Sequence, residues 1–191
     1  MGILKIATIG EPVLREIAHP LSQEDLQTPV IQSFIDDLIA TMRDAAGAGI
    51  AANQVFRPLQ ICAICVENNP RYPYKPNFPL TVLVNPELEV TDPETFRNFE
   101  GCLSVPNLRG EVERYTGVHV RAWDRFGAAL SFEVRGLTAG TFQHELDHLG
   151  GKLFVDRVAD PRTLCTWQAF ERYHQASFVE RAKALVQKYG Q

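Results

Sequence analysis

Two histidines four residues apart, with a glutamate directly after the first, stand in the stretch QHELDHLGG at residues 143–151. Residues at i and i+4 lie one turn apart on the same face of a helix, so His144 and His148 can offer ring nitrogens to one metal ion. Glu145, beside the first ligand, can then take a proton from a water on that metal, as the general base of a metal hydrolase does. The alternative for the isolated motif is a surface helix whose histidines only make hydrogen bonds.

A catalytic metal site also needs a third protein ligand and an open position for water. The extended pattern HExxHxxGxxH fails at Phe154, which cannot bind metal, so that group of metalloproteases is excluded. Two candidates remain, and they predict different enzymes. Glu171 on a later helix would give an endopeptidase, whereas Cys102 in the stretch FEGCLSVPN would give a mixed thiolate and imidazole site. A closed structural zinc site is a third interpretation, but no fourth cysteine or histidine lies near in sequence to complete it.

The helix that carries the motif is predicted to be capped near Thr138 or Thr141 and to stop at Gly150 and Gly151. An earlier helix is expected to begin after the capping residue Thr28. Its apolar face is expected to consist of Val30, Phe34, Leu38 and Met42, before Gly47 and Gly49 end it.

A last helix is expected to begin at Asp160 and Pro161 and to keep an apolar stripe against the body of the protein. Short valine-rich runs separated by Gly, Pro and Asp predict strands at 59–66, 81–90, 116–123 and 129–136. The predicted fold class is therefore α+β, with antiparallel or mixed β-sheets packed around a central helix that carries HExxH, and with an N-terminal and a C-terminal helix.

Prolines at 70, 73, 76 and 79 give the stretch NPRYPYKPNFPL a period of three. That period suits an extended polyproline segment and makes an SH3-type ligand conceivable. We expect instead a surface loop, stiffened by proline and inserted between two strands. The cysteines of CAIC, Cys62 and Cys65, lie in a run that reads as a strand, so we expect two core cysteines rather than a metal pair.

The chain has 191 residues, 45% of them hydrophobic, which predicts a single domain over residues 1–191. Its formal charge of -4 argues against a nucleic-acid partner, because phosphate binding needs a concentrated basic face. The N-terminus shows no signal peptide or membrane span, so we expect a cytoplasmic protein of bacterial type, with an organellar origin as the alternative. The oligomeric state is left open by the sequence.

Three segments taken together resemble the signature motifs of the peptide deformylase family. They are GAGIAANQ at 47–54, EGCLS at 100–104 and QHELDH at 143–148, in the order and spacing of that family. The similarity also covers TIGEPVLREIAHPL near the start and GKLFVDR after the histidine motif, so it extends to about residue 157. Asn53 stands where the family more often has proline, and Gly150 where it often has asparagine.

The resemblance implies that Cys102, His144 and His148 hold one divalent metal ion, with water at the fourth position. It favours Fe²⁺, with Zn²⁺, Ni²⁺ or Co²⁺ as substitutes. The implied reaction is hydrolysis of the formyl group on an N-terminal methionine by hydroxide on the metal, with release of formate. Glu145 would serve as general base and then as general acid. The substrates would be N-formylmethionyl peptides and nascent chains, which implies work near the ribosome.

The same resemblance implies roles for residues outside the metal site. The Gln54 side-chain amide and the backbone NH of Leu103 would stabilise the negative charge that develops on the formyl oxygen. Gly47 and Gly49 would let the backbone approach an extended substrate, although Gly47 can also be read as a plain helix stop. Arg109 would lie near the peptide chain, with a solvated surface arginine as the alternative interpretation.

Overall fold

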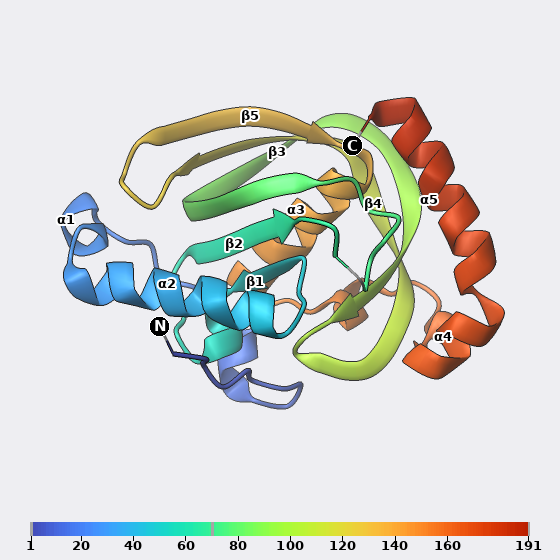
Figure 1. The fold of residues 1–191 in the computed structure, drawn as a ribbon, viewed down its shortest axis with the longest axis horizontal. Helices are drawn as coiled ribbons and strands as arrows, with labels where there is room; N and C mark the ends of the chain where they lie inside the picture. Colours follow the sequence, from blue (N-terminus) through green and yellow to red (C-terminus); the bar gives the residue numbers. More distant parts are fainter. Residues whose placement is uncertain (1, 70, 191) are drawn as a thin grey trace.

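The structure is a computed structural model that describes residues 2–69 and 71–190. It contains α-helices, strands and four short 3-10 helices in an α+β arrangement (Figure 1). The α-helices are α1 (Gln23–Leu26), α2 (Pro29–Asp44), α3 (Gly136–Leu149), α4 (Trp167–Tyr173) and α5 (Gln175–Tyr189). The strands are β1 (Gly49–Ala51), β2 (Ile61–Val66), β3 (Phe78–Cys102), β4 (Val105–Trp123), β5 (Ala129–Arg135) and β6 (Cys165–Thr166). The 3-10 helices are η1 (Pro12–Arg15), η2 (Ala52–Val55), η3 (Phe154–Arg157) and η4 (Pro161–Thr163).

The strands form one sheet in the order β1-β2-β3-β4-β5, and β6 adds to β4 outside that path. Each of these pairings is antiparallel. Helix α2 packs on one face of the sheet, and α3 packs on the other face, behind β2 in the view of Figure 1. The predicted fold class, with the HExxH helix at the centre, is confirmed.

Strand β2 explains how both helices find an apolar surface. Every residue from Ile61 to Val66 is buried, because side chains alternate between a face covered by α2 and a face covered by α3. Cys65 packs in the cluster with α2, and Cys62 packs in the cluster with Ala139 and Phe142 of α3. The expectation that CAIC supplies two core cysteines is confirmed.

Strands β3 and β4 are much longer than the predicted runs at 81–90 and 116–123. Their register continues from Val84 paired with Trp123 to Cys102 paired with Val105, with bulges that bend the ribbon. The sequence did not predict the outer half of this two-stranded ribbon of β3 and β4, because residues 91–98 are mostly polar. An antiparallel ribbon can carry such residues where one of its sides faces solvent. The consequence for the site is that Cys102 ends a strand, beside a tight turn.

Thr28 caps α2 as predicted, with its side chain accepting a hydrogen bond from the NH of Ile31. The predicted apolar face is wrong at Val30, which is 71% exposed. The predicted stop of the histidine helix at Gly150 is confirmed, because α3 ends at Leu149 with Gly150 as its C-cap. Its predicted N-terminal caps at Thr138 or Thr141 are wrong: α3 starts at Gly136, directly after β5. Gly136 has a φ of 57°, a conformation that suits glycine, so the chain turns directly from strand to helix, with Arg135 at the N-cap and no side-chain capping hydrogen bond.

The single last helix that was predicted from Asp160 is wrong. Asp160 caps the short 3-10 helix η4, and β6 follows before α4 and α5, which are separated at His174. Pro70 of the proline-rich stretch lies outside the described residues. Among the residues that the structure describes, no helix combines the length and apolarity that a membrane crossing requires.

Candidate metal centre

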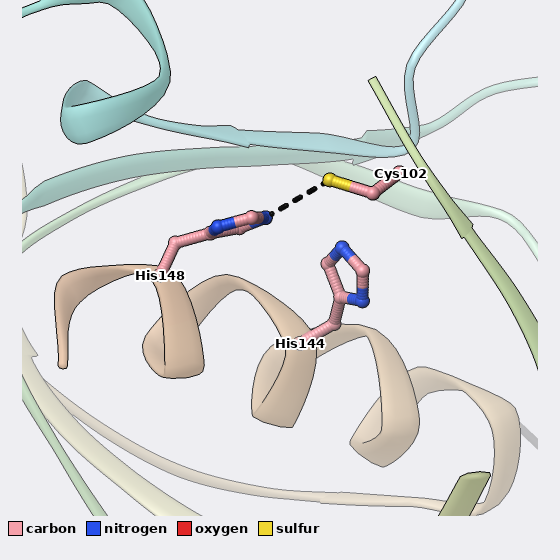
Figure 2. Close-up of side chains that lie close together, drawn as sticks. All are labelled: Cys102, His144 and His148. Atoms are coloured by element: carbon pink, nitrogen blue, oxygen red, sulfur yellow. Dashed lines mark hydrogen bonds between the residues drawn. The ribbon is translucent and has the colours of Figure 1, made fainter. Parts of the chain in front are cut away.

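Helix α3 and the end of β3 bring two imidazoles and one thiol together (Figure 2). The rings of His144 and His148 lie with their centroids 5.0 Å apart, one turn from each other on α3. The Sγ of Cys102 is 3.2 Å from Nε2 of His148. The three candidate ligand atoms all lie within 4.8 Å of one another, so one cation placed among them can contact all three.

Residues from the first and second motifs hold the sulfur in place. Gln54 lies in η2, where its Oε1 accepts a hydrogen bond from the NH of Ala51 at 2.9 Å. Its Nε2 donates to Ser104 Oγ at 3.0 Å and to Cys102 Sγ at 3.4 Å. The NH of Ser104 donates to the same sulfur at 3.4 Å. Donors aimed at sulfur suit a thiolate, which is the form that binds metal.

A buried carboxylate orients the first histidine. Glu100 Oε2 lies 2.8 Å from Nδ1 of His144, which directs the other ring nitrogen toward the cluster. Arg114 donates to both oxygens of Glu100, at 2.7 and 2.9 Å, and to Asp147 at 2.6 Å. Burial alone would raise the pKa of Glu100, but Arg114 and His144 hold it well below its usual range. Glu100 therefore stays ionised.

His148 is almost fully buried, and its Nδ1 has no hydrogen-bond partner among the described residues. Burial, with the neighbouring His144, lowers the pKa of His148 well below its ordinary value. A neutral imidazole has a free lone pair, which is what metal binding requires.

Glu145 is buried beside the cluster, and its Oε2 has no hydrogen-bond partner in the described part of the chain. Burial raises the pKa of this carboxyl to about 7, against the opposing effect of His144 and Lys75. Gly49 in β1 makes room for it: a Cβ there would lie 2.6 Å from Cδ of Glu145. A side chain at position 49 would therefore displace the Glu145 carboxyl group from its present position.

A pocket opens next to the cluster, and it brings together most of the residues that the sequence proposed. Leu103 lies in the turn between β3 and β4, adjacent to Cys102. A Cβ at Gly47 would lie 3.0 Å from the Leu103 side chain, so this glycine sits where the backbone is closely approached. The lining consists of Gly47, Ala48, Gly49, Gln54, Tyr72, Tyr74, Lys75, Asn98, Phe99, Glu100, Gly101, Cys102, Leu103, Arg109, Gly140, Thr141, His144 and Glu145.

Arg109 is buried, so its interpretation as a solvated surface arginine is wrong. It donates to the carbonyl oxygen of Phe99 at 2.5 Å and stacks on Trp167 and Phe170, 4.5 and 4.0 Å from their ring centroids. Its Nε has no hydrogen-bond partner in the described part of the chain. An arginine held by two aromatic rings keeps that donor in a fixed position at the pocket wall.

Sequence reasoning gave no role to several residues that build the site. Glu100 stands in the quoted EGCLS motif, and strand alternation, which puts residues 100 and 102 on one face, was a usable signal. Tyr72, Tyr74 and Lys75 come from the proline-rich stretch, which covers the pocket instead of projecting as a plain surface loop. No local pattern in that stretch indicated which residues of the fold it would contact.

Glu171, the alternative third ligand, lies on α4 and accepts a hydrogen bond from Nε1 of Trp167 at 2.6 Å. Among the described residues, the group that could hold a metal ion consists of Cys102, His144 and His148, without Glu171 and without a fourth side chain. The endopeptidase interpretation is therefore not favoured, and neither is the closed structural zinc site.

The family model of polypeptide deformylase matches residues 3–163 of the chain. A peptide deformylase 2 from Nostoc sp. is 38% identical over 169 residues, 88% of this chain and 93% of the relative. A peptide deformylase from Cellvibrio japonicus is 39% identical over 176 residues, 92% of this chain and 98% of the relative.

Solved structures agree in fold over nearly their whole length. The class I type b peptide deformylase from Acinetobacter baumannii with Met-Ala-Ser bound matches with a TM-score of 0.79 and 39% identity, covering 82% of this chain and 98% of that one. A peptide deformylase from Synechococcus elongatus in complex with actinonin matches with a TM-score of 0.74 and 31% identity, covering 98% of this chain and 86% of that one.

Proposed function

The chain belongs to the polypeptide deformylase family, and from that premise we propose that it hydrolyses the formyl group from the N-terminal methionine of new peptide chains, releasing formate. The observation that carries this proposal is the meeting of Cys102 with His144 and His148 beside the unpaired Glu145 carboxylate. A relative solved with Met-Ala-Ser bound, a peptide that begins with methionine, supports the choice of substrate.

Cys102, His144 and His148 would hold one divalent ion. One thiolate and two imidazoles suit ferrous iron as well as zinc, and we propose iron as the resident ion, with zinc, nickel or cobalt as substitutes. When bound, such an ion supplies Lewis-acid chemistry, polarising a carbonyl group and acidifying water. The donor set of the chain fits this ion, since His148 offers a neutral ring and donors surround the sulfur.

Glu145 would move the proton. Its free Oε2 can accept a proton from the attacking water and then deliver it to the departing amine nitrogen. A carboxyl group with a pKa of about 7 is suited to both directions of transfer near neutral pH. Gly49, which has no side chain, leaves the space that the Glu145 carboxyl group occupies.

Gln54 and Leu103 would stabilise the oxygen on which negative charge develops. Gln54 is fixed through its Oε1, so its Nε2 is a preorganised donor at the pocket wall. The longer of its two contacts, 3.4 Å to Cys102 Sγ, is the one that a substrate oxygen would replace. The NH of Leu103, next to the cysteine, would be the second donor.

Gly47, Gly49 and Arg109 would position the peptide. Both glycines line the pocket, and an extended substrate would pair with the backbone there as an added strand. The held guanidinium of Arg109 would then donate to a carbonyl oxygen of the peptide.

We further propose that the described chain acts as one catalytic domain in a bacterial-type cytoplasm, close to ribosomes that release formylated chains. The decisive experiment measures formate released from a formyl-Met-Ala-Ser peptide by anaerobically prepared, iron-loaded protein. Release of stoichiometric formate and free peptide is expected. Folded, iron-loaded protein that leaves the peptide intact would overturn the proposal.

Two variants separate this proposal from the endopeptidase. Cys102→Ala is expected to lose the metal and the formate release together, whereas Glu171→Gln is expected to keep both, because Glu171 contacts Trp167 and not the cluster. Metal analysis of the two purified proteins checks this. The opposite pattern would assign the third ligand to Glu171.

A further inference from the structure

The described residues between β2 and β3, 67–69 and 71–77, form a roof over the pocket. Asn69 Nδ2 donates to the carbonyl oxygens of Ala46 and Gly47, at 3.0 and 3.2 Å. Arg71 donates to the carbonyl oxygen of Ala45 at 3.1 Å. These contacts tie the start of the segment to the loop that follows α2, so the residues after it are carried across the pocket instead of into solvent.

The roof presents the ammonium of Lys75 to the pocket. Its Nζ donates to Thr141 Oγ1 at 2.8 Å, and the Thr141 hydroxyl in turn donates to the carbonyl oxygen of Leu137. The Nζ also lies 5.0 Å from the centroid of the Tyr72 ring, which attracts the charge but offers no oxygen acceptor. An ammonium carries three N–H donors, so two remain for oxygen acceptors of a ligand. In the described part of the chain no carboxylate lies within ion-pair distance of Nζ, although Glu100 and Glu145 face the same pocket.

The stem of Lys75 is held by apolar neighbours, which keeps its polar end turned to the pocket. Together with Thr141 it borders a second, tightly filled space formed with Val66, Phe78 and Leu137. Swinging the side chain out would expose this apolar lining. The ammonium is thus a fixed part of the pocket wall.

Other polar groups lie at the same end of the pocket. Thr141 stands three residues before the metal-binding His144 on α3, about 4.5 Å along the helix axis. Asn98 on β3 lines the pocket too, and one of its amide N–H groups donates to Glu100. Gly140 between them adds no side chain. The part of the pocket one helical turn away from the metal centre is therefore lined mainly by short or polar side chains.

In a formylated peptide the Cβ of the first residue is three bonds from the formyl carbon, so with the formyl group at the metal centre the first side chain comes within reach of this region. We propose that Lys75, with Thr141 and Asn98, selects first side chains that are unbranched and end in an oxygen acceptor. Glutamate, glutamine and the sulfoxide of methionine belong to this class. This inference rests on the proposed deformylation, because it concerns which first side chain of a formylated peptide the proposed active site accepts best.

The physical reason is the cost of an unpaired donor. A hydrocarbon chain beside the ammonium would strip water from its two remaining N–H groups and offer nothing in exchange. Sites built to hydrogen-bond a substrate discriminate strongly against an analogue that lacks the acceptor. The thioether of methionine is a weak acceptor, so it would be used but not preferred, whereas its sulfoxide is of similar length and strongly polar.

The test compares peptides of the form formyl-Xaa-Ala-Ser, with norleucine, methionine, methionine sulfoxide, glutamine or glutamate as Xaa, on the iron-loaded enzyme. The kcat/KM for the three oxygen-bearing side chains is expected to exceed that for norleucine by roughly ten- to a hundredfold, the range of a hydrogen bond to a charged group. In Lys75→Met this ratio is expected to fall toward one. Ratios within one protein are independent of how much of it carries metal.

Lys183→Met is the matched control, because Lys183 is exposed on α5 and pairs with Glu180. It should leave all ratios unchanged. Should Lys75→Met fail to fold, Thr141→Val removes the acceptor that holds Nζ and is expected to lower the ratio by a smaller factor. Norleucine cleaved as fast as glutamine would overturn this inference while leaving the deformylase proposal intact. Absence of formate from every peptide would overturn the deformylase proposal itself.

Discussion

The metal centre and the roof of the pocket are built in different ways. In the centre, the ligands stand on regular elements, and two of them have polar support: Gln54 and Ser104 donate to Cys102, and a chain runs from His144 through Glu100 to Arg114. In the roof, an irregular segment is held by hydrogen bonds from Asn69 and Arg71 to backbone carbonyls and by aromatic packing against the C-terminal helices. Tyr74 meets Phe178 edge to face at 5.1 Å, and Trp167 lies 6.5 Å from Tyr72.

This difference separates chemistry from selectivity. The residues that would cleave the formyl group depend on short, fixed spacings within α3 and at the end of β3. The residues that would read the substrate side chain depend on a loop whose neighbours lie far along the chain. Changes in the roof are therefore expected to alter which peptide is used, whereas changes in the centre are expected to abolish turnover.

The largest effect is expected for Glu145→Gln in the metal centre. The amide cannot accept the proton, so kcat is expected to fall about 10²- to 10⁴-fold while the metal content per chain stays unchanged. Formate release and metal analysis on the same sample check both halves. Glu180→Gln, on the exposed face of α5, is the matched control and should match the parent enzyme. A fully active Glu145→Gln protein would remove the proton-transfer role.

Arg114→Met tests whether the paired network holds the centre together. Its side chain is 3% exposed and its loss leaves Glu100 as an uncompensated buried charge, so the free energy of unfolding is expected to drop by about 3–5 kcal/mol. Urea unfolding of the protein measures this. Arg97→Met, at an arginine that is 66% exposed, should cost less than about 1 kcal/mol. Equal effects of the two variants would contradict the distinction.

Trp167→Ala tests the roof. Trp167 packs between Arg71 and Arg109, whose guanidinium carbons lie 5.1 and 4.5 Å from its ring. Loss of these contacts is expected to raise KM about three- to thirtyfold and to change kcat much less. Steady-state kinetics on one peptide separates the two constants. Tyr173→Ala removes an exposed aromatic ring from the same helix and should change neither; a fall in kcat alone for Trp167→Ala would tie the roof to the chemistry.

The smallest effect concerns pH. Burial lowers the pKa of Lys75 to about 8, with Glu100 and Glu145 opposing the shift and Arg109 adding to it. The ammonium is therefore charged below pH 8 and loses its charge above it. The preference for formyl-glutamate over formyl-glutamine peptides should be present at pH 7 and fade by pH 9. Because both peptides share one enzyme, the titration of Glu145 cancels from the ratio; a ratio constant with pH would exclude Lys75 as its source.

The sequence predicted the centre because its information is local. His144, Glu145 and His148 lie within five residues of one helix, and Cys102 and Gln54 stand in short motifs that resemble a family. The structure brings these residues together at one centre, and their chemical roles stay predictions until the variants are measured. Gly49 was assigned to the substrate, and the structure adds that a side chain there would collide with Glu145.

The roof and the outer ribbon were not predictable in the same way. Lys75 looks like any lysine in a proline-rich loop, and its position depends on packing against Thr141, 66 residues later. The polar residues in the second half of β3 lack an apolar alternation, because the ribbon shows one face to solvent. The break at His174 between α4 and α5 leaves the apolar period almost unchanged, so one helix was predicted where two exist.

The long ribbon of β3 and β4 also bears on the order in which the molecule assembles. Cys102 is 46 residues from His148, and it reaches its place only after a 25-residue strand has zipped against a 19-residue strand. Such non-local pairing is slow compared with helix formation. We therefore expect ion capture to be a late event in biogenesis, after α3 has left the ribosome, so that stopped-flow uptake of cobalt would report the last kinetic phase of folding.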